Sequence, residues 1–201
     1  DKSASNGFST ASADEIAQYQ EIWPVGTTER LVFDLALYTG AARVDLARIG
    51  RRDISDGLLT YRRQKSGTIA EVPVTRELRA VIDGAPDIAP AFLLTSKGKP
   101  FTAAGLGNFF GAAARAASME ARLHGLRKAF CTYWAEKGAS TSQIAAMAGH
   151  MSFSEVARYT RAADRRRMVR LLVDRDKLAT HRLTDGTHFV SILNIGGKFG
   201  L

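Results

Sequence analysis

A short stretch late in the chain combines residue types suited to phosphoryl chemistry. The pair Gly149-His150 is followed by Tyr159, nine residues after the histidine. Nine residues of unbroken helix would place the imidazole and the phenol on opposite faces, so they can meet only if the helix breaks between them. Gly149 is a strong helix stop, and Ser152 with Glu155 forms a capping-box pattern that starts a new helix. The pattern therefore predicts that both side chains can reach one site.

Basic residues surround Tyr159 in the sequence. Arg158 and Arg161 lie close to it, and three more arginines follow at positions 165–167. An isolated phenol has a pKa of about 10, so it needs cationic neighbours to act as a nucleophile near neutral pH. A tyrosine among cations is suited to attack on a phosphate. Taken alone, the segment also fits a partly buried tyrosine on a solvated basic helix.

Three more basic residues stand where they can meet an anion. His124 and Arg127 are three residues apart at the start of a predicted helix, so they share one face of it. Lys65 lies at the tip of a predicted hairpin. Each of these features by itself also fits an ordinary surface residue.

The elements that must position these groups are mostly helices. Apolar periodicity and capping residues such as Thr27 predict them, and Gly40 and Gly149 end two of them. The predicted helices cover residues 14–23, 29–39, 42–49, 75–82, 103–117, 124–137 and 141–148, with a basic helix continuing to about 173. The hairpin strands are predicted at 58–63 and 69–74, and short extended runs at 92–95 and 189–195.

The charge of the chain favours a polyanionic partner. Its 201 residues include 28 Lys+Arg and 20 Asp+Glu, a formal net charge of +8. Residues 43–79 hold nine basic and five acidic residues, and residues 115–182 hold fourteen and six. The single cysteine, Cys131, excludes a disulfide framework and a cysteine-based zinc site. With no long apolar run and no leader-like segment, we expect a reducing, cytoplasmic setting.

In chain order, Lys65, His124-x-x-Arg127, Gly149-His150 and Tyr159 resemble the catalytic domain of the tyrosine recombinase (phage integrase) family. The resemblance implies an α+β fold, mainly α with a small antiparallel β-sheet, which is the DNA breaking-rejoining fold of that family. Residues 1–10 would be an interdomain linker or the end of an expressed fragment, and 11–173 the catalytic domain. Residues 174–201 would be a tail that docks in trans or is disordered. We expect the chain to be a catalytic-domain fragment.

The resemblance also implies a role for each member of the set. Tyr159 would attack the scissile phosphate and hold a 3′-phosphotyrosyl bond. Arg127, His124 and His150 would stabilise the non-bridging oxygens, and Lys65 would protonate the departing 5′-oxygen. No cofactor is implied, because the phosphotyrosine keeps the bond energy without ATP or metal. Further DNA contacts are expected from six basic residues: Arg43, Arg62, Arg63, Lys128, Arg158 and Arg161.

One position departs from the family pattern. The family has another catalytic arginine in the motif Thr-Gly-x-Arg-x-x-Glu/Asp, whereas here Thr39-Gly40 leads to Ala42 at that position, three residues before Asp45. Arg43 is one residue away, which on a helix turns the side chain by about 100°. We therefore expect site-specific recombination or integration with impaired cleavage. An engineered change and a natural decay both explain the alanine.

Other functions stay open. Ala42 supports a non-cleaving DNA-binding protein, such as a regulator or a decayed relic of a mobile-element integrase. A general basic RNA- or DNA-binding domain would bind any polyanion and form no covalent adduct. A relaxing topoisomerase with a tyrosine nucleophile would share the chemistry. For a recombinase, the expected partners are a double-stranded DNA recombination site and, in the full-length protein on DNA, three more copies in a tetramer. The expected location is the bacterial cytoplasm at the nucleoid, with no membrane.

Overall fold

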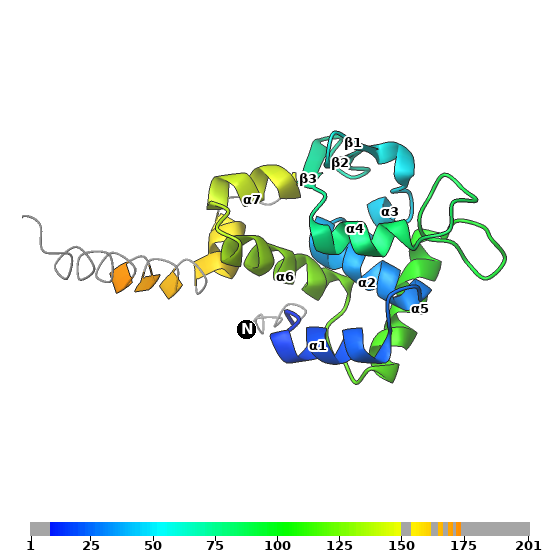
Figure 1. Cartoon of the computed structure of the whole chain (residues 1–201), viewed down its shortest axis with the longest axis horizontal. Helices are drawn as coiled ribbons and strands as arrows, with labels where there is room; N and C mark the ends of the chain where they lie inside the picture. The colour runs from blue at the N-terminus through cyan, green and yellow to red at the C-terminus, as the bar shows by residue number, and fades with distance from the viewer. Residues whose placement is uncertain (1–8, 150–153, 162–164, 167–168, 171, 174–201) are drawn as a thin grey trace, which may run out of the picture. The chain divides into compact units, whose positions relative to one another are not determined.

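Helix α2 (Thr28–Thr39) is the central element of the fold. The computed structural model describes residues 9–149, 154–161, 165–166, 169–170 and 172–173 (Figure 1). In α2 the nine residues from Leu31 to Thr39 are buried, and the helix packs against α4 (Arg76–Asp83), α5 (Ala103–Ala116) and α6 (Leu123–Glu136). A helix that is buried on nearly every side must be apolar all round, and the run LVFDLALYT is close to that pattern.

Capping side chains define where the helices begin. Ser12, Thr27, Thr75, Thr102 and Ser140 each accept a hydrogen bond from the backbone N–H three residues later. Each such cap stabilises a helix by about 1 kcal/mol. These caps start α1 (Ala13–Ile22), α2, α4, α5 and α7 (Thr141–Ala148), so the predicted cap at Thr27 is confirmed.

Glycines in the left-handed conformation end two helices where the sequence predicted stops. Gly40 follows α2 with φ 60°, and Gly149 follows α7 with φ 64°. Such backbone angles suit glycine because it has no Cβ. The predicted helix at 42–49 is shorter than expected: α3 spans Arg43–Leu46, and a 3₁₀ turn, Arg51–Asp53, follows.

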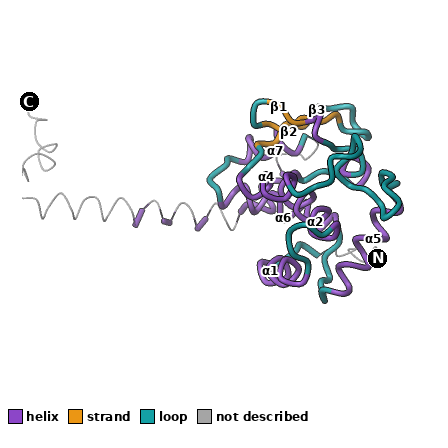
Figure 2. The backbone as a smooth tube through the Cα atoms, turned by 45° about the vertical axis from the view of Figure 1, so that its right-hand side comes forward, coloured by secondary structure: helices purple, strands orange, loops and turns teal. Residues whose placement is uncertain are grey.

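A three-stranded antiparallel sheet stands beside the helices, in the order β1-β2-β3 (Figure 2). The predicted hairpin is confirmed as β2 (Leu58–Arg62) and β3 (Ile69–Pro73), with Leu59 opposite Val72 and Tyr61 opposite Ala70. These four side chains are buried, and the strand residues between them are exposed or only partly buried. The sequence did not predict β1 (Ile54–Ser55), a two-residue strand too short to show a pattern. Helix α7 packs against β3.

A second apolar cluster joins α6, α7, β3 and the helical segment 154–161. It contains Val72, Phe130, Cys131, Trp134, Ile144, Met147 and Val156, among others. Val156 is fully buried, so this cluster fixes the segment that carries Tyr159. The single thiol, Cys131, is buried there, and burial raises its pKa to about 12. The mainly helical architecture with one small antiparallel sheet confirms the predicted fold class.

The contacts divide the chain into two units, Asp1–Ala163 and Asp164–Leu201. In the second unit the described residues, 165–166, 169–170 and 172–173, are helical. The predicted strand at 189–195 and the tail 174–201 lie outside the described residues, as do residues 1–8 and the predicted capping residue Ser152.

Candidate active site

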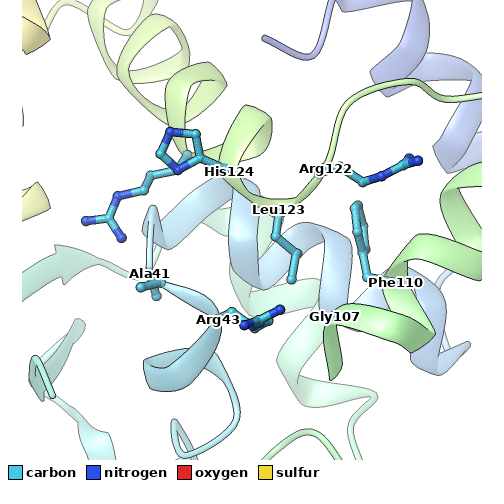
Figure 3. Close-up of a pocket in the computed structure, with 9 residues that line it drawn as sticks. Ala41, Arg43, Gly107, Phe110, Arg122, Leu123 and His124 are labelled. Atoms are coloured by element: carbon cyan, nitrogen blue, oxygen red, sulfur yellow. The ribbon is translucent and has the colours of Figure 1, made fainter. Parts of the chain in front are cut away.

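The first turns of α6 form one wall of a pocket of about 320 Å³ (Figure 3). Helix α6 supplies His124 and Arg127 to it, and the segment around α3 supplies Ala42 and Arg43. His124 and Arg127 therefore share one face of the helix, as the sequence predicted. The full lining is Ala41, Ala42, Arg43, Gly107, Phe110, Arg122, Leu123, His124 and Arg127.

Arg127 is the buried cation of this wall, with only 6% of its surface exposed. Burial and, to a smaller extent, the positive charge of Arg63 lower the pKa of its guanidinium, while Tyr61 and Asp45 raise it; the result is a pKa of about 10. A group with this pKa stays protonated at neutral pH. A positive charge held in a partly dry site interacts more strongly with an anion than a solvated charge does.

His124 is exposed at the pocket, but the protein around it still lowers the pKa of its imidazole. Partial burial is the largest cause, the positive charges of Lys128 and Arg127 add to it, and Glu155 opposes it. An unperturbed histidine has a pKa of about 6.5, so a downward shift leaves the ring uncharged at physiological pH. A neutral imidazole can accept a proton on one nitrogen and donate a hydrogen bond from the other.

Tyr159 is held against the outer side of α6. The Thr132 hydroxyl donates a hydrogen bond to the Tyr159 carbonyl at 3.3 Å, and Lys128 Nζ lies 5.6 Å from the centroid of the phenol ring. One helix therefore carries the pocket residues His124 and Arg127 and also docks the tyrosine. Sequence reasoning placed Lys128 among DNA contacts and did not anticipate its contact with Tyr159, because the pair is 31 positions apart and no local pattern links them.

The hairpin turn that carries Lys65 is fastened to the end of α7. The Thr68 hydroxyl donates a 2.6 Å hydrogen bond to the Gly149 carbonyl. Lys65 and Arg62 are exposed, and Arg62 Nη1 donates to the Gly67 carbonyl at 2.7 Å. The structure thus brings the lysine turn next to the residue that precedes His150. His150 itself lies outside the described residues.

Arg63 was expected to contact DNA, but its side chain is buried. It is 3% exposed, its Nη1 donates to the Ala148 carbonyl at 2.6 Å, and its Nη2 lies 3.9 Å from Asp45 Oδ2. The sequence held a signal for this burial: Leu59, Tyr61 and Arg63 alternate at the period of a strand, so all three face the same, buried side.

Arg43 extends toward Gly107 of α5. A Cβ at Gly107 would lie 2.6 Å from Arg43 Nη1, so the guanidinium lies directly over that glycine (Figure 3). Ala42 caps α3 without a side-chain hydrogen bond and is only partly buried at the pocket rim. The remaining expected DNA contacts, Arg158 and Arg161, are exposed on the segment that carries Tyr159.

The sequence pattern of the phage integrase family matches residues 8–166 of this chain. Because that match covers most of the chain, the protein belongs to the phage integrase family. No curated protein sequence shows a significant match. The family assignment confirms the resemblance that the ordered motif set indicated.

Solved structures of integrases and of a recombinase share the fold of this chain. A lambda integrase (residues 75–356) dimer bound to a COC′ core site is 24% identical, with a TM-score of 0.64 over 76% of this chain and 59% of that one. A lambda integrase tetramer bound to a Holliday junction is 25% identical, with a TM-score of 0.60 over 73% of this chain and 48% of that one. XerA recombinase is 17% identical, with a TM-score of 0.67 over 84% and 65%. This chain thus spans about half to two thirds of the length of these relatives.

In the part of the chain that the structure describes, no helix has the length and apolar character needed to cross a bilayer.

Proposed function

We propose that this chain is the catalytic part of a site-specific DNA recombinase that cleaves and rejoins strands through a 3′-phosphotyrosyl intermediate. One observation carries the proposal: the ring of Tyr159 lies beside Lys128, and Lys128 belongs to α6, the helix that also carries His124 and Arg127. A tyrosine oxygen next to a cluster of cations suits in-line attack on a phosphodiester. The match to the phage integrase family supports the same reaction class.

In the proposed cleavage step, the Tyr159 oxygen forms a bond to phosphorus as the bond from phosphorus to the 5′-oxygen breaks. The phenolic proton passes to a histidine, His124 or His150, and the 5′-oxygen takes a proton from Lys65 to become a hydroxyl. Arg127 stabilises the charge on the non-bridging oxygens. Rejoining is the reverse reaction with a 5′-hydroxyl from another strand, so the proposed cycle consumes neither ATP nor metal.

Ala42 bears on the rate of this reaction. Two guanidinium groups share the charge of the transition state in the family pattern, and only one of those two positions, Arg127, is an arginine here. The loss of one preorganised donor typically costs on the order of 10² to 10³ in rate. We infer that the alanine leaves DNA binding nearly unchanged but slows cleavage.

The proposed partner is a double-stranded recombination site, and the proposed active assembly is a tetramer of the longer protein. The relatives support both, because lambda integrase is seen as a dimer on a core site and as a tetramer on a Holliday junction. The exposed arginines at 62, 158 and 161 are suited to phosphate contacts. We further propose residues 11–173 as the catalytic domain.

A nicked suicide substrate tests the proposal. Such a substrate loses the short strand after cleavage and traps the covalent protein–DNA adduct, which denaturing electrophoresis separates from free protein. We expect a slow adduct with the given chain and none with Tyr159→Phe. If a chain that binds the site forms no adduct, and Ala42→Arg does not restore one, the second candidate is favoured. That candidate is a non-cleaving DNA-binding protein, and the alanine at position 42 is the observation that supports it.

A further inference from the structure

Asp45 is a buried carboxylate on α3, the short helix that follows Ala42. Its side chain is 2% exposed, and it is the acidic residue that follows the Thr-Gly motif. A buried carboxylate without a cation is strongly unfavourable, because its lost hydration must be replaced by nearby positive charge or hydrogen bonds. Position 42, three residues before Asp45, is an arginine in the family motif but an alanine here. It therefore cannot supply that charge.

Arg63 supplies it from a different element. Its guanidinium, delivered from the end of β2, lies 3.9 Å from Asp45 Oδ2 and donates to the Ala148 carbonyl. Both side chains are buried to more than nine tenths. The guanidinium of Arg43 lies over Gly107 of α5 instead.

The pair links three segments that carry candidate catalytic residues. Asp45 Oδ1 accepts a 2.9 Å hydrogen bond from the backbone N–H of Gln64, the residue directly before Lys65. Arg63 Nη1 binds the last carbonyl of α7, one residue before Gly149. The positive charge of Arg63 also acts on Arg127. A change at this pair is therefore transmitted to the lysine turn, to the segment leading to His150 and to Arg127.

Within the described part of the chain, two atoms of the pair still lack hydrogen-bond partners: Arg63 Nε and Asp45 Oδ2. Only Nη2 of Arg63 approaches Asp45, and its distance of 3.9 Å from Oδ2 is longer than a hydrogen bond. Oδ2 of Asp45 can therefore accept a second donor, and position 42 is the N-cap of the helix that carries Asp45, three residues before it.

We propose that Arg63 is a positioning residue: it acts as the counter-ion of Asp45 in place of the arginine that is absent from position 42. This inference rests on the proposed function. Arg63 is too buried to touch a phosphate. It preserves the geometry of the site, but it cannot make the contact with the scissile phosphate that an arginine at position 42 would make. The chain should thus depend on Arg63 for cleavage, and an arginine at position 42 should relieve that dependence.

The test is a double-mutant cycle on the suicide substrate. The four proteins are the given chain, Arg63→Met, Ala42→Arg and the double variant, with Lys97→Met as an exposed-lysine control. We expect Arg63→Met to slow adduct formation on the order of 100-fold in the given chain, since small misplacements of reacting groups have effects of that size. In the Ala42→Arg background the same change should cost less than about tenfold, which is a strong coupling between the two positions. Equal losses in both backgrounds would overturn the proposal.

Arg63→Met leaves a buried unpaired carboxylate and could fail to fold. Thermal unfolding of each variant checks this, and Asp45→Asn with Arg63→Met removes both charges together. The folded double-neutral protein should still cleave at least tenfold more slowly than the given chain, because Lys65 and the end of α7 have lost their common anchor. If it cleaves at the rate of the given chain, Arg63 is not a positioning residue. Failure of the proposed function looks different: no Tyr159-dependent adduct forms in any protein that retains Arg63.

Discussion

The ammonium group of Lys128 lies over the ring of Tyr159, 5.6 Å from its centroid. Lys128 is the residue after Arg127 on α6, and Thr132, one turn further, holds the backbone of the tyrosine segment. The proposed nucleophile, Tyr159, and the pocket residues His124 and Arg127 are thus positioned by one helix, α6. Their relative positions depend on the packing of Val156 against the apolar side chains of α6.

Removal of this ammonium should slow cleavage. A cation over an aromatic ring is worth about 0.5–1 kcal/mol at exposed sites, and the nearby positive charge also favours the negative charge that develops on the tyrosine oxygen. We expect Lys128→Met to slow adduct formation on the order of tenfold, and Lys128→Arg to retain most of the rate because arginine keeps the cation–π contact. Single-turnover adduct formation measures both. A rate for Lys128→Met equal to that of Lys97→Met would contradict the role.

His124 should titrate below the ordinary histidine range. Burial and the charges of Lys128 and Arg127 lower its pKa, and Glu155 raises it. Lys128→Met removes a repelling charge and should move the pKa up, whereas Glu155→Gln removes an attracting charge and should move it down. NMR titration of the imidazole protons, with His124→Gln for assignment, gives the values. A pKa at or above about 6.5 in the given chain would show that the surroundings do not disfavour the imidazolium.

Arginine at position 42 should raise the cleavage rate. The residue would restore a second guanidinium for the transition-state charge, and we expect an increase on the order of 10²- to 10³-fold. DNA affinity should change little, because one phosphate contact is a small part of the electrostatic term. The matched control is Ala42→Arg with Tyr159→Phe, which should form no adduct. Rapid cleavage by the unaltered chain would instead mean that another cation already fills the position.

DNA binding should weaken steeply with salt. If the two basic segments contact roughly 6 to 10 phosphates, affinity should fall by orders of magnitude between about 50 and 200 mM salt. Arg62→Gln should reduce the slope of log affinity against log salt by about 1, as expected for one phosphate contact. Lys97→Gln, in an exposed turn outside both segments, should leave the slope unchanged. A slope near zero for the given chain would rule out this surface as the DNA-binding face.

Gly40 should not tolerate a side chain. Its φ is 60°, and a Cβ there would lie 2.8 Å from two ring carbons of Phe130. The left-handed conformation alone costs a non-glycine residue about 1–2 kcal/mol, and the clash with the ring adds to that. Gly98 is the matched control, with φ 67° and open space around its Cβ position. Chemical denaturation should show a larger loss of unfolding free energy for Gly40→Ala than for Gly98→Ala. Equal losses would mean that the Phe130 ring moves aside without cost.

The local pattern of the sequence was enough to predict most of the elements and the family. Caps at Thr27, glycine stops at 40 and 149 and the alternation in the 58–74 hairpin act over a few residues, so they can be read without knowing the rest of the chain. Helix α3 came out shorter than predicted, because capping and periodicity define the ends of an element less well than its presence.

Tertiary packing alone determined how the candidate site is arranged. The Thr68–Gly149 hydrogen bond spans 81 residues and the Arg63–Ala148 bond spans 85. Short-range patterns cannot specify such contacts, which form only when β3, α7 and α6 bury their apolar faces together. The sequence by itself identified the residues that could act on a phosphate. Strand alternation indicates that Arg63 is buried, but only the fold determined that Asp45 is its partner and that Arg43 lies over Gly107, because the contacts of a side chain depend on which surfaces the surrounding elements leave open.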